Sequence, residues 1–306
     1  MSMIMQRISA VVRHARRGTL LQRLKTEYRQ RLKKFRCNHW EYYKRHKSHV
    51  DVTIAKDVMM RLYTDDVLSH LIYCKGHEYN ERQFLSRYLK TGDVFIDVGA
   101  NSGLYSLLAS SIVGREGRVF AFEPSPVPFT RLKENAQLHG KKNIECFDTA
   151  LSDREDKMEL NISCEGHSAW DTFASGTRSG QTGTREVLST TLDQFISGKN
   201  LLDKITMIKI DVEGWETHVL TGGIKSLIRP EAPLLQIEFT DLVSMPAGYT
   251  CRKLYAQVVE LGYQLCVYDI KTGQLHLDPP RKEYPNLNLY AVKNLEQANR
   301  RLLEKL

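Results

Sequence analysis

The sequence predicts an α/β fold in which a mostly parallel sheet is covered by helices on both faces. From Asp93 onward, short apolar runs alternate with longer segments of helical spacing. Such alternation produces a parallel sheet between two helical layers. In addition, residues 93–103 pass from an apolar strand into a loop with two glycines and then into a helix. Doubly wound folds hold a nucleotide at a corner of this kind.

The first fifty residues form a basic arm. They carry 14 of the 44 Lys and Arg but only Glu27 and Glu41, so the net charge of +8 comes from the arm. Apolar residues recur at helical spacing within residues 4–36, and we expect a basic amphipathic helix there. Such a helix suits an anionic membrane surface. It also suits packing on the body or on a second subunit, docking of RNA or an acidic partner, or an organelle transit peptide.

Residues 49–92 are expected to form a lid that precedes the sheet. Residues 50–54 and 59–63 have strand character, and residues 50–75 as a whole are expected to hold strands and turns. A helix over 78–89 ends at Lys90-Thr91-Gly92.

Seven strands and four helices are expected from Asp93 to the end of the sheet. The strands are 93–98, 118–123, 143–148, 205–211, 232–239, 263–268 and 287–292, and the helices are 103–112, 126–139, 214–228 and 251–261. Ligands of such sheets bind at the carboxyl ends of the strands. Five acids occur at these ends and are expected to line one rim: Asp97, Glu123, Asp148, Asp211 and Glu238.

Residues 150–200 interrupt this alternation. Strands are expected at 157–162 and 186–192. The segment 166–184 between them is rich in Gly, Ser and Thr and contains His167, Trp170 and Phe173. It is either a substrate-covering loop or a plain surface loop.

The remaining composition excludes several classes of protein. No apolar run has the length of a membrane span. The six cysteines are scattered without a Cys-x-x-Cys pair, which argues against a zinc site and a disulfide framework. We therefore expect a reducing compartment, the cytoplasm, with a peripheral place at the membrane as an option. The arm, not the body, carries the excess charge, so nucleic acid is not an expected partner of the catalytic domain; the oligomeric state is left open.

Glu123 identifies the nucleotide corner as a nucleoside site. It closes the second apolar strand, 20 residues after Gly103. An acid at the tip of this strand accepts hydrogen bonds from ribose hydroxyls. The spacing from Gly99 to Gly103 is Gly-x-x-x-Gly, which differs from the Gly-x-Gly-x-x-Gly of dinucleotide folds.

Four motifs in order give the chain a family resemblance. They are Asp97-Val98-Gly99-Ala100-Asn101-Ser102-Gly103, Phe122-Glu123-Pro124, Ala150-Leu151-Ser152 and Ile208-Lys209-Ile210-Asp211-Val212-Glu213-Gly214. With these motifs the chain resembles the FkbM-type S-adenosylmethionine-dependent methyltransferases. The resemblance implies a class I methyltransferase fold, a seven-stranded sheet whose last strand is antiparallel. It implies a methyltransferase domain over 49–306, with a core over 93–295, and the basic arm over 1–48 lies outside the resemblance.

The resemblance also implies binding roles for S-adenosylmethionine. Asp97 and Ala100 belong to the cofactor loop, and Gly99, Asn101 and Gly103 lie against the methionine portion. Glu123 holds the ribose hydroxyls. Asp148 and Thr149 lie near the adenine. Asp211 faces the cofactor's amino group or the substrate.

The expected reaction is O-methylation of a sugar, glycan or related small metabolite. A hydroxyl acceptor needs a base to remove its proton. The candidates are Asp211, Glu213, Glu238, His218 and His167. Asp211 is the first choice, Glu238 is the expected acceptor of the substrate hydroxyl, Glu213 is a candidate base or a helix cap, and His218 is expected to be structural.

Four alternatives stay open. Asp211 with Glu238 suits a divalent cation, but no neighbouring His supports it and we expect no metal. Trp215 stands where family members often have His, so it either stacks on a sugar face or packs. The protein could instead methylate nitrogen on a protein or RNA docked by the arm, or bind the cofactor without catalysis.

Overall fold

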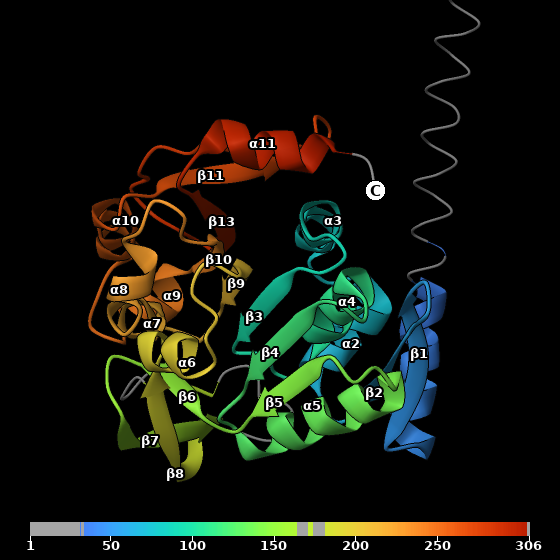
Figure 1. Ribbon diagram of the computed structural model, residues 1–306. Coiled ribbons are helices and arrows are strands. Elements are labelled where there is room, and N and C mark those ends of the chain that lie inside the picture. Colours follow the sequence, from blue (N-terminus) through green and yellow to red (C-terminus); the bar gives the residue numbers. More distant parts are fainter. Residues whose placement is uncertain (1–30, 32–33, 164–170, 174–180, 305–306) are drawn as a thin grey trace, which may run out of the picture. The chain divides into compact units, whose positions relative to one another are not determined.

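The computed structural model describes residues 31, 34–163, 171–173 and 181–304 (Figure 1). It divides the chain into two compact units. The first comprises Met1–Val50 and Leu62–His77, and the second comprises Asp51–Arg61 and Glu78–Leu306. No helix in the described part of the chain is long and apolar enough to span a bilayer.

The second unit is built on an eight-stranded sheet of order β12-β11-β13-β10-β9-β3-β4-β5. Five strands are parallel: β3 (Val94–Val98), β4 (Arg118–Phe122), β5 (Ile144–Phe147), β9 (Ile205–Ile210) and β10 (Leu234–Phe239). β13 (Leu287–Val292) runs antiparallel between β10 and β11 (Gln264–Asp269). The predicted parallel sheet with an antiparallel last strand is therefore confirmed. The predicted count of seven is one too low, because Gln274–Leu277 forms a short β12 that pairs with β11.

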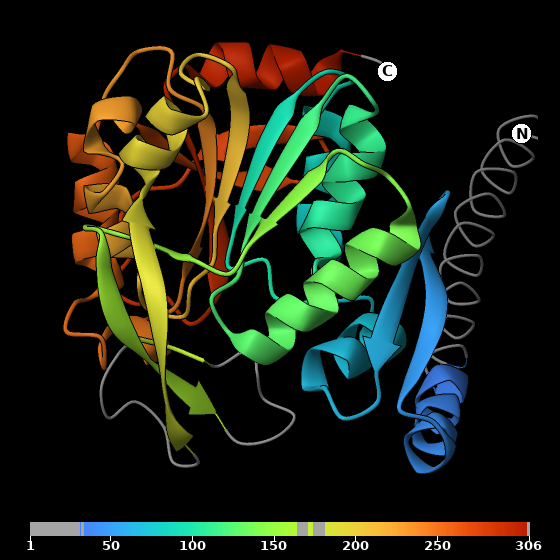
Figure 2. The ribbon, with the colours of Figure 1, turned by 60° about the horizontal axis from the view of Figure 1, so that its bottom comes forward.

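Helices cover both faces of this sheet (Figure 2). On one side lie α3 (Tyr79–Tyr88), α4 (Leu104–Val113) and α5 (Pro126–His139), and on the other α7 (Glu216–Thr221), α8 (Ile224–Leu227) and α10 (Cys251–Glu260). Three further helices were not predicted: α6 (Leu192–Gly198), α9 (Asp241–Ser244) and α11 (Leu295–Leu303).

The single helix predicted over 214–228 is wrong, because α7 and α8 are separated by Gly222 and Gly223. A Cβ at Gly222 would lie 1.9 Å from the carbonyl oxygen of Ser152. The close approach of β6 (Ala150–Ser152) to this point therefore requires glycine and ends α7 there.

The alternation of side chains along the strands gives the sheet two different faces. Val94, Ile96 and Val98 of β3 belong to the main apolar cluster, together with residues of β4, β9, β10, α6, α7 and α10. Asp97 lies on the other face and is fully buried. That face of the sheet therefore carries buried polar side chains, and the candidate site lies on it.

A small three-stranded sheet follows β5, in the order β6-β8-β7. β7 spans Asp156–Ser163 and β8 spans Gln181–Thr191. The two strands predicted in this region are confirmed, except that Leu192 begins α6 instead of ending β8. The candidate base His167 lies outside the described residues, as does Trp170 of the same segment.

The hairpin of β1 (His49–Ala55) and β2 (Val58–Tyr63) confirms the two strands predicted before the sheet. Its Arg61 N–H donates to Asn135 Oδ1 of α5 at 2.6 Å. The Asn135 amide donates to the carbonyl of Ser102 at 2.9 Å. Asn135 thus connects the hairpin with the loop that follows β3, and the lid role stays a prediction.

The first unit contains a helix over residues 34–46 and α2 (Val67–Lys75). The prediction of strands and turns over 50–75 missed α2. Asp66 caps it by accepting a hydrogen bond from the Ser69 N–H at 2.8 Å. Most of the helix predicted over 4–36 lies outside the described residues.

Candidate functional site

The loop after β3 is clamped between its two neighbouring strands. The N–H groups of Gly99 and Ala100 donate to the carbonyl of Phe122 at 3.0 and 2.9 Å. On the other side, a Cβ at Gly99 would lie 1.8 Å from the carbonyl oxygen of Asp211. Gly99 also has a φ of 80°, which favours glycine. Any other residue at this position would push the loop away from β9.

The second glycine starts α4. Gly103 is its N-cap at a φ of 97°, and a Cβ there would meet Leu132 Cδ1 at 2.8 Å. Between the glycines, Asn101 has a φ of 48°, and its side chain accepts from the Ser102 N–H at 2.7 Å. The loop is thus a tight turn leading into a helix N-terminus, as its sequence predicts.

Glu123 faces this loop from the end of β4. Its Oε2 accepts from the Asn101 N–H at 2.8 Å, and its Oε1 accepts from the Ser125 N–H at 2.9 Å. Burial raises the pKa of Glu123 to about 7, against the lowering effect of these two hydrogen bonds. Each carboxylate oxygen has a second lone pair and can accept a further donor.

Asp171 is a site residue that the sequence analysis missed. It accepts a hydrogen bond from the Ser125 hydroxyl, and its other oxygen accepts from the Ser163 N–H at 2.7 Å. Its charge helps to raise the pKa of Glu123. Nothing in the surrounding Gly- and Ser-rich sequence distinguishes it from an ordinary loop residue.

The next residue reaches the opposite side of the loop. Thr172 Oγ1 donates to the carbonyl of Glu213 at 2.7 Å, and its backbone pairs with Asn161 of β7. Residues 171–173 therefore connect the Glu123 corner with the segment after β9.

A buried polar row crosses the sheet beneath the rim. Asp97, Lys209 and Gln236 are register partners on β3, β9 and β10. Asp97 accepts from the Ser106 hydroxyl at 2.6 Å, and burial raises its pKa. Asp97 was expected at the rim, but it lies inside the sheet, fully buried. Asp97 therefore interacts with the buried Ser106 and Lys209.

Lys209 supplies the positive charge of this row. It is 3% exposed, and its Nζ lies 2.7 Å from Asp211 Oδ2 and 4.8 Å from the centre of the Tyr105 ring. Burial alone would lower the pKa of Lys209, but the carboxylates of Asp211 and Asp97 raise it. Lys209 lies within the Ile208–Gly214 motif, but its sequence context does not predict this role.

Three acids meet at the rim above this row. Carboxylate oxygens of Asp211, Glu213 and Glu238 all lie within 4.8 Å of one another. Burial raises the pKa of Glu238 well above its usual range, and the charges of Asp211 and Glu213 add to this while Lys209 opposes it. The arrangement combines a carboxylate paired with lysine and a carboxyl with raised proton affinity.

Glu216 holds the segment that carries Glu213. Its Oε1 accepts from the N–H groups of Val212 and Gly214 at 3.1 and 3.2 Å, and its Oε2 accepts from the Tyr249 hydroxyl. Burial raises the pKa of Glu216. Glu213 has a φ of 50° and does not cap α7, whose N-cap is Trp215. The expectation of a helix cap at Glu213 is therefore wrong.

Trp215 packs against His218 beside the segment that follows β9. The two rings stack with centroids 3.6 Å apart, and Phe173 lies 5.2 Å from the indole. Trp215 Nε1 donates to Ser152 Oγ at 3.1 Å. Burial lowers the pKa of His218. These contacts give Trp215 and His218 a packing role, as the structural interpretation of His218 expects.

Asp148 and Thr149 follow β5, the edge strand beside β4. Asp148 is exposed and Thr149 half-buried. Their adenine role stays a prediction.

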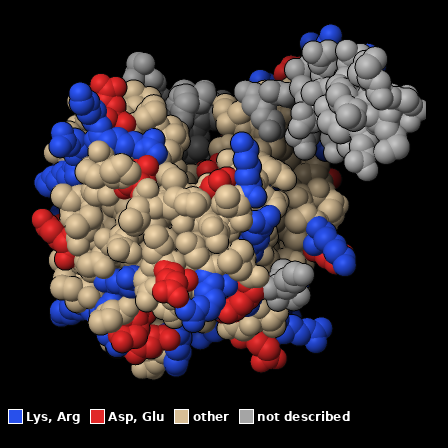
Figure 3. Space-filling model, turned by 90° about the horizontal axis from the view of Figure 1, so that it is seen from above, with Lys and Arg blue, Asp and Glu red and all other residues tan. Residues whose placement is uncertain are grey.

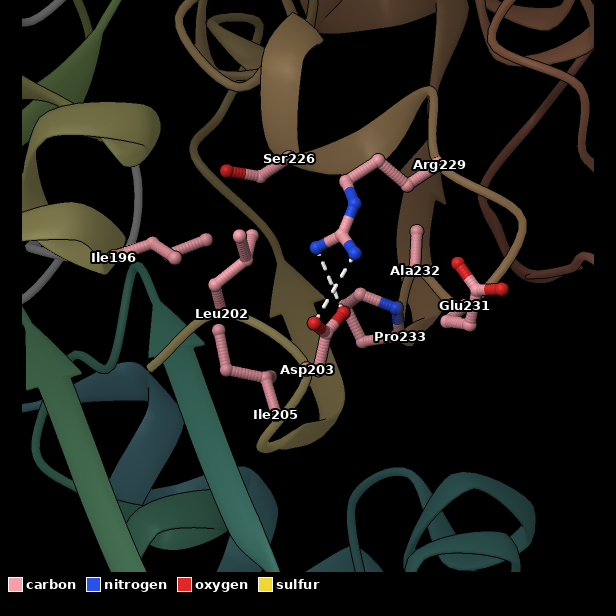
Figure 4. A pocket seen from close by; sticks show the side chains of 9 residues that line it. All are labelled: Ile196, Leu202, Asp203, Ile205, Ser226, Arg229, Glu231, Ala232 and Pro233. Atoms are coloured by element: carbon pink, nitrogen blue, oxygen red, sulfur yellow. Dashed lines mark hydrogen bonds and ion pairs between the residues drawn. The ribbon is translucent and has the colours of Figure 1, made fainter. Parts of the chain in front are cut away.

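A pocket opens at the opposite end of the parallel strands from the rim acids (Figure 4). It lies where β9 and β10 begin, and the ion pair of Arg229 and Asp203 spans it at 2.7 Å. Ligands of parallel sheets bind at the carboxyl ends of the strands, so we do not assign the reaction to this pocket.

A family model described as "Methyltransferase FkbM domain" matches residues 97–265, more than half of the chain. The chain belongs to the FkbM methyltransferase family. The domain is that of an S-adenosylmethionine-dependent methyltransferase. The match begins at Asp97 and includes both the glycine loop and the Asp211 segment.

Three curated relatives match parts of the chain. The chain is 31% identical over 140 residues to hexuronic acid methyltransferase AglP of Haloferax volcanii, which covers 44% of this chain and 52% of that protein. It is 26% identical over 172 residues to 2-O-methyltransferase NoeI of Sinorhizobium fredii (52% and 68%). It is 50% identical over 52 residues to 31-O-demethyl-FK506 methyltransferase FkbM of Streptomyces tacrolimicus (17% and 19%). The chain thus spans about half of AglP and about a fifth of the Streptomyces enzyme.

Solved structures with a related arrangement include methyltransferase FkbM from Methylobacillus flagellatus. It superimposes with a TM-score of 0.43 and 16% identity, covering 73% of this chain and 52% of that chain.

The residues of the FkbM domain fit the cofactor. Glu123 has spare lone pairs beside a glycine turn and a helix N-terminus, a donor and acceptor set suited to a ribose and an α-amino acid. Ser102 Oγ and Asp97 Oδ1 are buried without a hydrogen-bond partner among the described residues. The unpaired Ser102 hydroxyl within the loop is the kind of group that a bound molecule would satisfy.

Proposed function

We propose that this FkbM domain methylates a hydroxyl of a sugar, a glycan or a related small metabolite. One observation carries the proposal: the cluster of Asp211, Glu213 and Glu238 adjoins the glycine loop at the rim of the sheet. A hydroxyl acceptor requires a base, and a clustered carboxyl with a raised pKa is suited to that task. The names of two relatives, a hexuronic acid methyltransferase and a 2-O-methyltransferase, support this acceptor class.

S-adenosylmethionine, when bound, supplies a methyl group on a positively charged sulfur, so the protein has chiefly to position the acceptor. The sequence favours Asp211 as the base. One of its oxygens is already paired with buried Lys209 at 2.7 Å. We therefore assign Asp211 to orienting the cofactor's ammonium or the substrate.

Glu238 takes the proton in this proposal. Desolvation and two neighbouring carboxylates raise its proton affinity. Glu213 accepts a hydrogen bond from a second substrate hydroxyl. Its backbone is held in place by Glu216, which accepts hydrogen bonds from the N–H groups on either side of it. Each role belongs to a side chain of this chain and needs no metal.

The test is a panel of acceptors incubated with the protein and the cofactor. The panel contains hexuronic acid oligosaccharides, neutral glycans, a peptide mixture and an RNA. We expect a mass gain of one methylene on a carbohydrate, at an oxygen assigned by NMR. Methylation of the peptides or the RNA alone would contradict the proposal and favour nitrogen methylation. Tight cofactor binding without transfer to any acceptor would favour a non-catalytic role.

We further propose that the protein is cytoplasmic and that residues 1–45 dock it on an anionic membrane. The arm is strongly basic, whereas basic and acidic side chains intermingle on the face of the described residues shown in Figure 3. The attraction would therefore be local to the arm and sensitive to salt.

Vesicle co-sedimentation tests this docking. We expect the chain to bind phosphatidylserine vesicles at low salt and a variant with Arg23, Lys25 and Arg29 changed to Gln to bind less. Changing the body residues Arg154 and Lys157 to Gln provides the control. Equal binding to neutral vesicles, or salt-sensitive binding to RNA alone, would contradict the proposal.

A further inference from the structure

The first unit brings together three potential metal ligands from two separate helices. The ligand atoms of Cys37, His70 and Cys74 all lie within 4.8 Å of one another. Cys37 comes from the helix over residues 34–46, and the other two come from α2. None of the three belongs to the methyltransferase site.

The spacing of His70 and Cys74 allows both side chains to bind the same metal ion. Residues four apart lie one above the other on the same face of a helix. The helix is well bounded, because Asp66 caps its start and Gly76 ends it with a φ of 63°. Both side chains therefore project from one rigid element.

Aromatic packing fixes the approach of Cys37. Trp40 lies one turn after Cys37 on the same helix and is 2% exposed. Its ring centre lies 5.8 Å from that of His70 and 5.5 Å from that of Tyr73. Tyr43, a further turn along, lies 6.0 Å from Tyr73. This side of the helix, including Cys37, packs on the face of α2 that carries the other two ligands.

We propose that Cys37, His70 and Cys74 bind a zinc ion. Two thiolates and an imidazole form a soft ligand set that zinc favours over magnesium or calcium. Tetrahedral Zn–S and Zn–N bonds place ligand atoms roughly 3.5–3.8 Å apart. The ligand atoms of the three residues lie within 4.8 Å of one another. Small side-chain rotations would therefore bring them to the distances that zinc requires. A water molecule or an external ligand fills the fourth position.

The small size of this unit explains what the metal would do. The buried apolar side chains among its described residues are few: Trp40, Val50, Leu62, Ile72 and Cys74. A small core gives little stability, and metal binding contributes directly to folding in such units. Zinc would fasten the end of the basic arm to α2. The expectation that the chain lacks a zinc site rested on the missing Cys-x-x-Cys motif, which does not detect ligands from two separate helices.

Metal content of the purified full chain tests the site. We expect one zinc ion per chain, and almost none after Cys37→Ser or Cys74→Ser. Cys146→Ser, at a half-buried cysteine of β5, and His39→Ala, on the Cys37 helix, are matched controls that should keep the metal. Replacement by cobalt should give a thiolate-to-cobalt charge-transfer band that both cysteine variants lose.

Alkylation of the wild-type chain does not depend on the folding of a variant. With zinc present we expect Cys37 and Cys74 to resist alkylation, and a chelator should expose Cys37 first because it is the less buried. Wild-type chain with no more zinc than Cys37→Ser would overturn the proposal. So would a disulfide between Cys37 and Cys74 in place of zinc protection.

Discussion

Glu123 already uses one lone pair of each carboxylate oxygen on a backbone N–H, from Asn101 and Ser125. Its remaining lone pairs are what the cofactor ribose would use. Because burial raises its pKa to about 7, the carboxyl changes charge within the physiological range. The residue that we expect to hold the ribose is therefore also a titrating group.

Cofactor affinity should consequently fall below pH 7. The sign follows from protonation, since a neutral carboxyl is a weaker acceptor than a carboxylate. We expect Kd for S-adenosylhomocysteine to rise up to about tenfold for each pH unit below 7. Calorimetry from pH 8 to pH 5 measures it. Glu123→Gln should bind weakly without this slope, whereas Glu145→Gln, at a half-buried acid of β5 that pairs with Arg118 and Lys199, should keep it. An unchanged slope in Glu123→Gln would rule the assignment out.

Lys209 is the second residue whose role depends on burial. It pairs with Asp211 and lies beside Asp97. Lys209→Met would leave two acids at the site without their cation, and breaking a buried pair costs about 3–5 kcal/mol. Urea unfolding should show a loss of this size, while Lys204→Met, at an exposed position just before β9, should change little. A loss no greater than that of Lys204→Met would contradict the pairing.

At the scale of elements, the glycines decide where helices end. Gly222 separates α7 from α8 because Ser152 approaches it, whereas Gly198 ends α6 with open space around it. The two positions therefore respond oppositely to the same substitution.

Gly222→Ala should destabilise the protein by more than about 2 kcal/mol, because the new Cβ would collide with a backbone oxygen. Gly198→Ala should instead stabilise it by roughly 0.5–1 kcal/mol, since alanine loses less conformational entropy in a helix. Thermal unfolding of both variants gives the comparison. Similar melting temperatures for the two would show that the contact with β6 does not determine the break.

The elements of the sheet could be predicted from sequence because each has a strong local pattern. The apolar runs of β3 and β4 are examples. So are Gly140 and Gly262, which directly follow the predicted helices 126–139 and 251–261 and adopt positive φ angles. α6 was missed because its capping box, Thr191 with Gln194, directly continues β8 without a break in pattern. α2 was missed because its start depends on one capping carboxylate, Asp66.

The candidate site could be predicted only where a motif marks it. The glycine loop, Glu123, Asp211 and Glu238 all lie at strand ends that the pattern gives. Asp171 and the pairing of Lys209 with Asp211 depend on tertiary contacts, for which the sequence has no local signal. The same holds for the Cys37, His70 and Cys74 cluster.

At the scale of the whole molecule, the two units divide the tasks that we propose. The second unit carries the cofactor loop, the polar row and the rim acids. The first carries the end of the basic arm and the proposed zinc ligands. Removing zinc should therefore lower the stability of the first unit and leave cofactor affinity unchanged. Calorimetric binding of S-adenosylhomocysteine before and after chelation measures this, and a large loss of affinity would show that the units are coupled.

The central claim is that Glu238 serves as the base for a hydroxyl acceptor. The most direct measurement is kcat for O-methylation by wild-type protein and by Glu238→Gln, with Glu231→Gln as the control at an exposed acid of the opposite edge. We expect Glu238→Gln to lose about 10²–10⁴-fold in kcat while its cofactor affinity stays within a few-fold of wild type. Wild-type turnover in Glu238→Gln would contradict the account.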